Sequence, residues 1–179
     1  MLNPLSLKDI IKDSLFEKEF PDNWNALSAG VGDYIAENLA MPGAYLGTIP
    51  SVPPVPDPLS GPYIWKPLSV VAPSGDVISK LASSGTGASV FASFVSQLIL
   101  GITFGGQDTK KVITLSAPVK LVQKAPFVLI PSTEFDINMI NLATGIIQAI
   151  LLSIPPVPPS VPSASTGGGV GATTFALVV

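Results

Sequence analysis

The chain has 179 residues, of which 47% are hydrophobic and only 12% are charged, and its formal net charge is -3. It contains no histidine, no cysteine and no arginine. Without these residues it cannot build a Ser-His-Asp or Cys-His nucleophile, a zinc site of the usual ligand types, or bidentate arginine contacts to phosphate. We therefore expect no catalytic residue, no metal site, no cofactor and no direct nucleic-acid partner.

The first forty residues predict a pair of soluble helices. Ser6 and Asp9 have the spacing of a capping box, and the apolar residues that follow recur at helical spacing. Pro21 ends this helix, and Asp22 can cap the next one. Residues 1–22 contain several acidic side chains that could in principle hold a cation. Lysines are interleaved with these side chains, so we favour a solvated helix face. The alternation of charged and apolar residues is not the pattern of a secretory signal.

A proline-rich segment follows at residues 42–75, and it contains the sequence "IPSVPPVPDPLSG" from Ile49 to Gly61. Prolines forbid a helix and remove donors from a sheet, so we expect an extended, largely polyproline II strap. Its interleaved aromatic and aliphatic residues argue against a free linker. The PxxP spacing also occurs in SH3 and WW ligands, but no basic residue lies close to orient such a ligand. We interpret the segment as a strap that lies against a neighbouring surface.

Residues 76–154 predict a core of helices and strands. A third helix can start at Asp76, and residues 86–104 form an uncharged run about as long as a bilayer core is thick. Residues 110–123 and 126–131 carry the β-branched alternation of two strands, both interrupted by proline and therefore edge-like. A last helix is expected from Asp136 to Ser153.

A second proline segment, "IPPVPPSVPSASTGGG", begins at Ile154 and leads into the C-terminal residues 155–179. The glycine-rich sequence "TGGGVG" that follows is similar to a phosphate-binding loop, but it lacks the lysine of one and precedes a strand, so we interpret it as a hinge. Glu134 and Asp136 form a carboxylate pair of the kind that acid–base catalysis needs, yet adjacent helix caps are the commoner reason for such a pair.

Two stretches of the chain are similar to one another. "ENLAMPGAYLGTIPSVPPVP" and "INLATGIIQAILLSIPPVPP" share an Asn-Leu-Ala start and a PPVP core. An internal structural repeat would explain the similarity, because each unit would be a helix followed by a strap that covers its neighbour. Chance is the alternative in a chain with 19 prolines.

These patterns predict an α+β fold that is mainly helical. In this fold, amphipathic helices are joined by extended proline-rich straps, with a few short edge strands. The expected organisation is a helical pair at residues 1–41, a proline-rich strap at 42–75, a helix–strand–helix core at 76–154, and a proline- and glycine-rich arm at 155–179.

Two functional hypotheses follow from the composition. A chain with few reactive side chains, many prolines and a charge-free C-terminal quarter is typical of a structural subunit that buries apolar area against other proteins. The alternative is a membrane-active protein of the pore or lysis type, which would use residues 86–104 and 137–154 as its apolar segments. We favour the first hypothesis and do not expect an enzyme.

The sequence also resembles a known class of proteins. From Ala40 to Pro118 a helix end, "PPVPDPLSGP", a glycine-punctuated Ala/Ser-rich helix and "ITLSAPV" follow one another. This order resembles small virion structural proteins of tailed bacteriophages. The resemblance implies a role in the tail, baseplate or neck of a particle, in many symmetric copies. The N-terminal helices and "TTFALVV" depart from the pattern and match nothing in it.

The resemblance further implies that the partners are copies of the chain and other structural proteins. The protein would then be located in the virion, or otherwise in a cytoplasmic assembly, with a membrane as the less favoured partner. The proline straps and the terminal strand would reach onto adjacent subunits. The candidate contact residues are seven large apolar side chains: Trp24, Tyr63, Trp65, Phe91, Phe94, Phe175 and Leu177.

Overall fold

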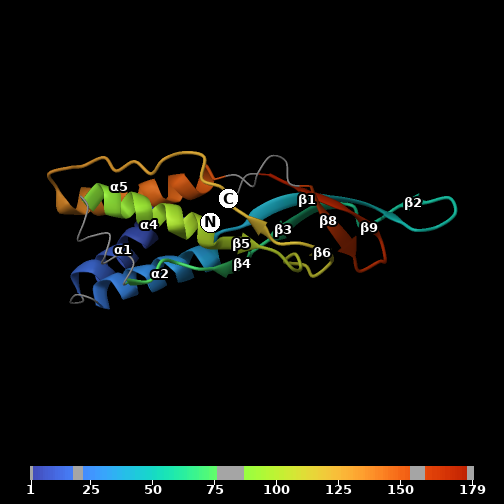
Figure 1. Cartoon of the computed structure of the whole chain (residues 1–179), viewed down its shortest axis with the longest axis horizontal. Coiled ribbons are helices and arrows are strands. Elements are labelled where there is room, and N and C mark those ends of the chain that lie inside the picture. Colours follow the sequence, from blue (N-terminus) through green and yellow to red (C-terminus); the bar gives the residue numbers. More distant parts are fainter. Residues whose placement is uncertain (1, 18–21, 76–86, 154–159, 177–179) are drawn as a thin grey trace.

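The molecule is elongated, with helices at one end and a projecting β-sheet at the other (Figure 1). The computed structural model describes residues 2–17, 22–75, 87–153 and 160–176. The third helix expected at Asp76, residues 154–159 of the second proline segment and Leu177 lie outside these described residues.

Four helices form the first half of the molecule within the described residues. They are α1 (Pro4–Phe16), α2 (Asp22–Asn38), α4 (Gly87–Gly101) and α5 (Phe135–Leu151). The helix α1 packs against both α2 and α5, and α4 lies beside α5. Their apolar faces supply most of the core, and each large aliphatic side chain that is fully buried there stabilises the fold by roughly 1.5–3 kcal/mol. The most deeply buried of these are Leu7, Ile11, Leu27, Val31, Ile35, Val95, Leu98, Ile99, Ile146 and Ile150.

The first helix begins earlier than its capping pattern predicted. Asn3 is the N-cap, and its side chain accepts a hydrogen bond from the amide of Leu5 at 2.9 Å. Pro4 follows at the first helical position, where its missing N–H costs nothing because that donor has no partner within a helix. The Asn-Pro pair was therefore the stronger start signal than Ser6.

Nine strands form two antiparallel sheets in the described part of the chain. The strands of the large sheet run in the order β2-β1-β9-β8-β6, and β3 also pairs with β1. They are β1 (Met41–Ile49), β2 (Val55–Pro56), β3 (Gly61–Trp65), β6 (Ile113–Leu115), β8 (Ser160–Ser165) and β9 (Val170–Phe175). The small sheet, in the order β4-β5-β7, joins this sheet to the helices; its strands are β4 (Pro67–Val70), β5 (Ile102–Phe104) and β7 (Val119–Lys120).

The predicted mainly helical fold is wrong. The described residues are 41% helical and 27% strand, which is a mixed α+β fold. The proline segments are not simply straps, because β1 to β4 fall within residues 41–70 and β8 begins at Ser160. Proline removes only the donor of a residue and keeps its acceptor. The carbonyls of Pro42 and Pro162 accept from the amides of Ala176 and Ser116 at 3.0 and 2.9 Å, so these prolines stay within the sheet.

The long segment before α5 was also expected to contain a strand, and it does not. Residues 126–131 are extended without ladder pairing and run along α5 (Figure 1). The segment is fixed to this helix by the side-chain amide of Asn141, which donates to the carbonyl of Ile130 at 2.8 Å. It also approaches Gly145, where an added Cβ would lie 2.8 Å from the ring of Phe127. The helix therefore needs glycine where this segment crosses it.

Two further expectations can be compared with these elements. Among the described residues no helix is both long and apolar enough to span a membrane.

The Asn-Leu-Ala starts of the two similar stretches of sequence differ in structure: the first lies at the end of α2 and leads into β1, whereas Asn141 to Ala143 lie within α5. The two Asn-Leu-Ala starts therefore do not share a local structure, and the PPVP core of the second stretch lies outside the described residues.

Candidate interaction surface

The strands β1, β9 and β8 present nine side chains on the outward side of the large sheet. Their pairing places them in three rows across the strands, because each outward residue of β9 lies between partners on β1 and β8. The rows are Ala44–Thr174–Ser160, Leu46–Ala172–Pro162 and Thr48–Val170–Ala164. We call these nine residues the outer face. All nine are uncharged, and all except the half-buried Ala172 are exposed.

The outer face has two protruding apolar side chains and a groove between them. Leu46 is 71% exposed and Val170 is 53% exposed. Between β1 and β9 lies a shallow groove of about 410 Å³, whose floor includes Gly47 and Gly171. These two glycines are directly paired, and a Cβ added to Gly171 would lie 2.1 Å from the carbonyl oxygen of Leu46. A side chain on Gly47 would point to the inner side of the sheet and collide with Tyr45, so the groove is the space left between the outward side chains of the neighbouring residues.

Aromatic side chains support the outer face from the inner side of the sheet. Tyr45 and Trp65 are fully buried, and Phe175 is nearly so. The rings of Trp65 and Phe175 meet edge to face, with their centroids 5.1 Å apart. Phe175 in turn lies over Gly43, where an added Cβ would be 2.8 Å from its ring. This packing fixes the relative position of β1, β3 and β9.

A buried carboxylate connects the turns at the far end of the sheet. Asp57 is only 2% exposed. It accepts hydrogen bonds from the hydroxyl of Tyr45 at 3.1 Å and from the amide of Leu59 at 2.9 Å, and it also bonds to the hydroxyl of Ser165. The backbone amide of Asp57 donates to the carbonyl of Gly47 at 2.9 Å. We call this carboxylate and its partners the Asp57 cluster.

The hydrogen bonds of the Asp57 cluster change the acidity of its members. The Ser165 hydroxyl, the Leu59 amide and the Tyr45 hydroxyl lower the pKa of Asp57 from its usual 3.8, and the charged form is therefore the stable one. Burial, together with the bond to Asp57, raises the pKa of Tyr45 above 10.0. A Cβ at Gly169 would lie 1.8 Å from a carboxylate oxygen of Asp57, so the β8–β9 turn can approach this group only as glycine.

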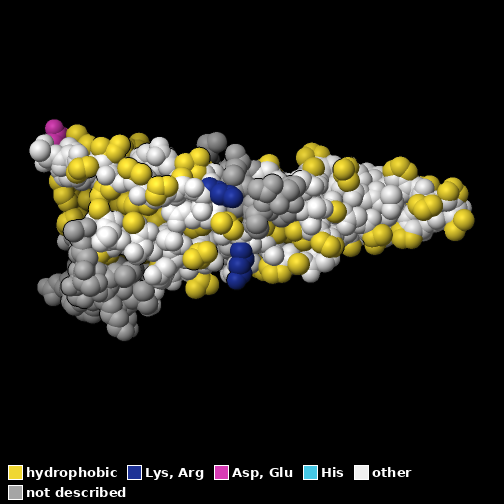
Figure 2. Space-filling model, turned by 45° about the horizontal axis from the view of Figure 1, so that its top comes forward, with side chains coloured by type: hydrophobic (Ala, Val, Ile, Leu, Met, Phe, Trp, Pro, Cys, Tyr) yellow, Lys and Arg dark blue, Asp and Glu magenta, His cyan; other side chains and the backbone are white. Residues whose placement is uncertain are grey.

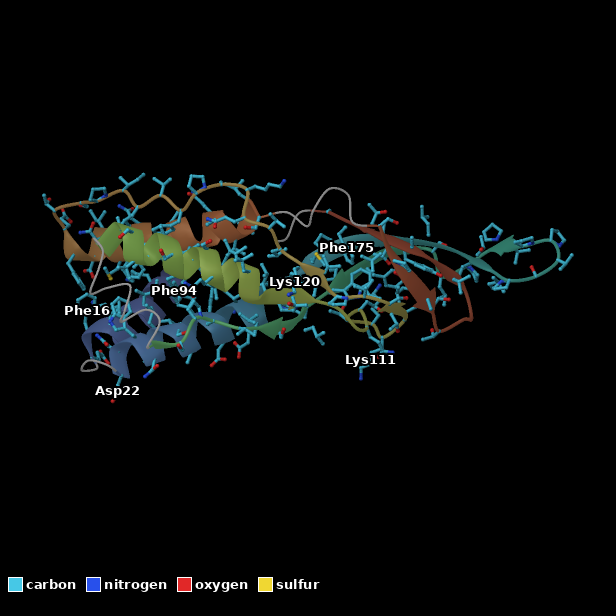
Figure 3. All side chains as sticks on the ribbon, viewed as in Figure 1. Phe16, Asp22, Phe94, Lys111, Lys120 and Phe175 are labelled. Atoms are coloured by element: carbon cyan, nitrogen blue, oxygen red, sulfur yellow. The ribbon has the colours of Figure 1, made fainter. Side chains whose placement is uncertain are left out.

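Charged residues are distributed unevenly along the molecule. In Figure 3, Asp22 lies at the helical end, Lys120 lies near the middle, and Lys111 lies below the base of the large sheet. Asp136 is also at the helical end, where it pairs with Lys12 at 3.4 Å. In the view of Figure 2, the half of the molecule formed by the sheet shows no lysine, aspartate or glutamate beyond the middle.

No protein-family model, curated protein or solved structure matches the chain.

Other hollows are present among the described residues, and one of about 360 Å³ beside β4 is lined by Lys66, Asp108 and Lys111 as well as neutral residues. Two more are nearly uncharged. A hollow of about 400 Å³ lies between α4 and residues 123–127, and one of about 320 Å³ lies beside α2 and residues 70–75. Each is lined mainly by small or neutral side chains with a single charged residue, Lys124 in the first and Asp33 in the second. Within the described ranges, no three carboxylates gather closely enough to hold a metal ion.

The structure places the candidate contact residues mostly inside the chain. Trp65, Phe94 and Phe175 belong to the buried core. Tyr63 is half-buried, and its hydroxyl donates to the carbonyl of Leu59 at 2.7 Å. Trp24 and Phe91 are partly buried and contact one another, with ring centroids 6.1 Å apart. Trp65 and Phe175 lie together in the sheet, whereas the Trp24–Phe91 pair lies among the helices; Leu177 is outside the described residues.

The outer face was missed because its residues are small. The predicted contact residues are mainly aromatic side chains, most of which this chain uses for its own core, and residues 42–75 were expected to form a strap. An available signal was the alternation in "GAYLGT", where the single aromatic residue is flanked by small or aliphatic neighbours, as in a strand with one buried side. The strand β9, which was expected to reach onto adjacent subunits, pairs with β1 and β8 of its own chain.

Proposed function

We propose that the chain is a structural subunit of a multi-copy protein assembly. The observation that carries this proposal is the outer face, an uncharged surface on a projecting sheet. Exposed faces of antiparallel sheets in soluble proteins usually carry polar or charged side chains. Here, nine positions in three rows carry none that is charged, and a surface of this kind is suited to contact with another protein.

The apolar exposure is not confined to this face. Val52 at the tip of the sheet is fully exposed, and Val128 and Ile130 on the segment that covers α5 are 62% and 67% exposed. Apolar contacts at several separate places are typical of a subunit that touches more than one neighbour. The elongated shape supports the same role, since the sheet projects well beyond the helices (Figure 1).

The type of assembly is proposed from the sequence pattern. The order of elements between Ala40 and Pro118 resembles small virion structural proteins of tailed bacteriophages, and this supports a place in the tail, baseplate or neck. The partners would be copies of the chain and other structural proteins of the particle, and the protein would be located in the virion. The mechanism is mechanical, because the chain contributes shape and contact area and no chemical step.

The number of copies in a purified native particle tests this proposal. We expect the chain to copurify with particles at a fixed ratio of several copies, measured by mass spectrometry against an isotope-labelled standard of the same chain. Recovery of the chain only in particle-free fractions would contradict the proposal. Flotation with liposomes is the companion measurement, and we expect the chain to stay at the bottom of the gradient, whereas a membrane-active protein would float with the lipid.

A further inference from the structure

The neutrality of the outer face identifies the kind of surface that can cover it. A charged partner would lose hydration on contact without gaining an opposite charge. The backbone donors and acceptors of β9 are already used by β1 and β8 on its two sides, so the contact must be made by side chains and not by strand addition. The partner must therefore offer an uncharged, flat surface with small apolar projections.

A second copy of the chain offers such a surface. We infer that the outer face of one copy packs on the outer face of another about a two-fold axis, an inference that rests on the proposed multi-copy assembly. A two-fold contact sets a patch against itself, and any charge close to the axis then meets the same charge. The outer face meets this condition because it has no charge.

The charges elsewhere favour contact through the sheet over contact through the helices. The helical end carries Asp13, Glu17, Asp22 and Glu134 on α1, α2 and the start of α5, besides the paired Asp136. Two copies that met by these ends would bring acidic groups together. Two copies whose outer faces meet about an axis across the strands keep those ends apart, because the sheet projects away from them and the copies then point in opposite directions (Figure 1).

The shape of the outer face also fits its own copy. Leu46 projects beside the groove between β1 and β9, and Val170 projects on the other side of it. A two-fold axis near the Leu46–Ala172 row allows each Leu46 to enter the groove of the other copy, over paired Gly47 and Gly171. The hydroxyls of Thr48 and Thr174 lie in the outer rows, where they stay close to solvent.

The size of the outer face indicates how strong the contact between two copies is. Three rows on three strands extend over roughly 300 Å² per partner, from strand spacings of about 4.8 Å and a rise of about 3.3 Å per residue. Stable dimers bury about 800 Å² per partner. The face-to-face contact is therefore weak by itself, and it gains strength where other contacts of an assembly hold many copies close together.

A single introduced thiol can test the contact, because the chain contains no cysteine. We would compare Leu46→Cys on the outer face with Leu100→Cys on α4, a control of similar exposure at 59%. Both full-length variants are treated with a bismaleimide cross-linker at matched concentration, and the rate of covalent dimer formation is measured. We expect Leu46→Cys to react at least about ten times faster, because a face-to-face contact raises the effective concentration of the two thiols.

Substitutions at Ala172, which is paired with Leu46, give a matched pair of tests. In the Leu46→Cys background, Ala172→Lys should reduce the cross-linking rate to that of the Leu100→Cys control, because the two lysines would repel across the axis. Ala172→Ser adds no charge and should leave the rate unchanged. Circular dichroism and urea unfolding of each variant confirm that the sheet is intact. Added salt should not slow the reaction of Leu46→Cys, since a neutral contact is not screened.

Equal rates for Leu46→Cys and Leu100→Cys would overturn the inference, and so would a Leu46→Cys rate that falls with salt. If Ala172→Lys prevents incorporation into particles although Leu46→Cys forms no homodimer, a different protein covers the face, and this result also overturns the inference. Each of these outcomes leaves the proposed function to be decided separately by the copy number in native particles.

Discussion

Replacing Trp65 by alanine is expected to lower the free energy of unfolding by about 3–5 kcal/mol, the range for deleting a large buried aromatic side chain. Trp65 is fully buried where β3 pairs with the start of β1. Its ring contacts Phe175 on β9 and Tyr63 on its own strand, at centroid distances of 5.1 and 6.4 Å. The substitution therefore removes the contact that holds three strands and leaves a cavity that backbone pairing prevents from closing.

Trp65→Phe gives a sharper comparison. The indole N–H of Trp65 is the one buried side-chain polar atom that lacks a hydrogen-bond partner among the described residues. Phenylalanine keeps an aromatic ring against Phe175 and removes this unsatisfied donor. We therefore expect Trp65→Phe to lower the free energy of unfolding by less than Trp65→Ala does. Ile64→Ala is the control on the same strand, because Ile64 is 47% exposed on the opposite side.

Urea unfolding followed by circular dichroism measures all three variants on the same scale. We expect Ile64→Ala to cost less than about 1 kcal/mol, as is usual for surface substitutions. If Trp65→Ala and Ile64→Ala were equally stable, the inner side of the sheet would not be the core that the packing indicates. Trp24 is the chain's other tryptophan. Tryptophan fluorescence of the Trp65 variants therefore reports on the helical half alone.

The helices were the part of the fold that the sequence predicted best. The apolar spacing of Leu27, Val31 and Ile35 marks the buried side of α2, and all three are fully buried. Such a pattern is local, because neighbours at three and four residues share one side of a helix. For α5 the expected start at Asp136 lies within one residue of the observed start at Phe135.

The large sheet could not be predicted in the same way, because its pairing is not local. The strand β1 pairs with β9 across a separation of more than 120 residues in sequence, as in the pair Ala44 and Thr174. Prolines inside β1, β3 and β8 also removed the usual strand signal. They are tolerated because the carbonyl remains an acceptor, as at Pro42 and Pro162. The alternation in "GAYLGT" could therefore indicate one buried side of β1, but not the outer face, which exists only through this pairing.

The Asp57 cluster is a second consequence of this non-local pairing, and it holds the end of the sheet that bears the outer face. Asp57 precedes β3, its partner Tyr45 lies on β1, and Ser165 lies at the end of β8. Loss of the carboxylate would leave the hydroxyl of Tyr45 and the amide of Leu59 without their acceptor in a buried site, which is costly. We therefore expect Asp57→Ala to lower stability clearly and to loosen the far end of β1 and β8.

The dependence of stability on pH separates the contribution of the carboxylate charge of Asp57 from the contribution of its side-chain shape. The folded protein lowers the pKa of Asp57 below 3.8, chiefly through the Ser165 hydroxyl and then the Leu59 amide. A carboxyl whose pKa is lower in the folded state stabilises the fold fully above its unfolded pKa. This stabilisation is lost as the pH falls below about 3.8 and passes through the folded pKa.

Asp57→Asn keeps the shape of the side chain but cannot carry the charge, so the difference in free energy of unfolding between wild type and this variant isolates the carboxylate. We expect that difference to be constant between neutral pH and about pH 5, and to shrink as the pH falls below 3.8, the usual pKa of the group. Urea unfolding of both proteins over this range measures it. A difference that stayed the same down to the lowest pH at which both proteins fold would mean that ionisation of Asp57 does not contribute to stability. The charged carboxylate would then have no part in holding the β8–β9 turn against β1.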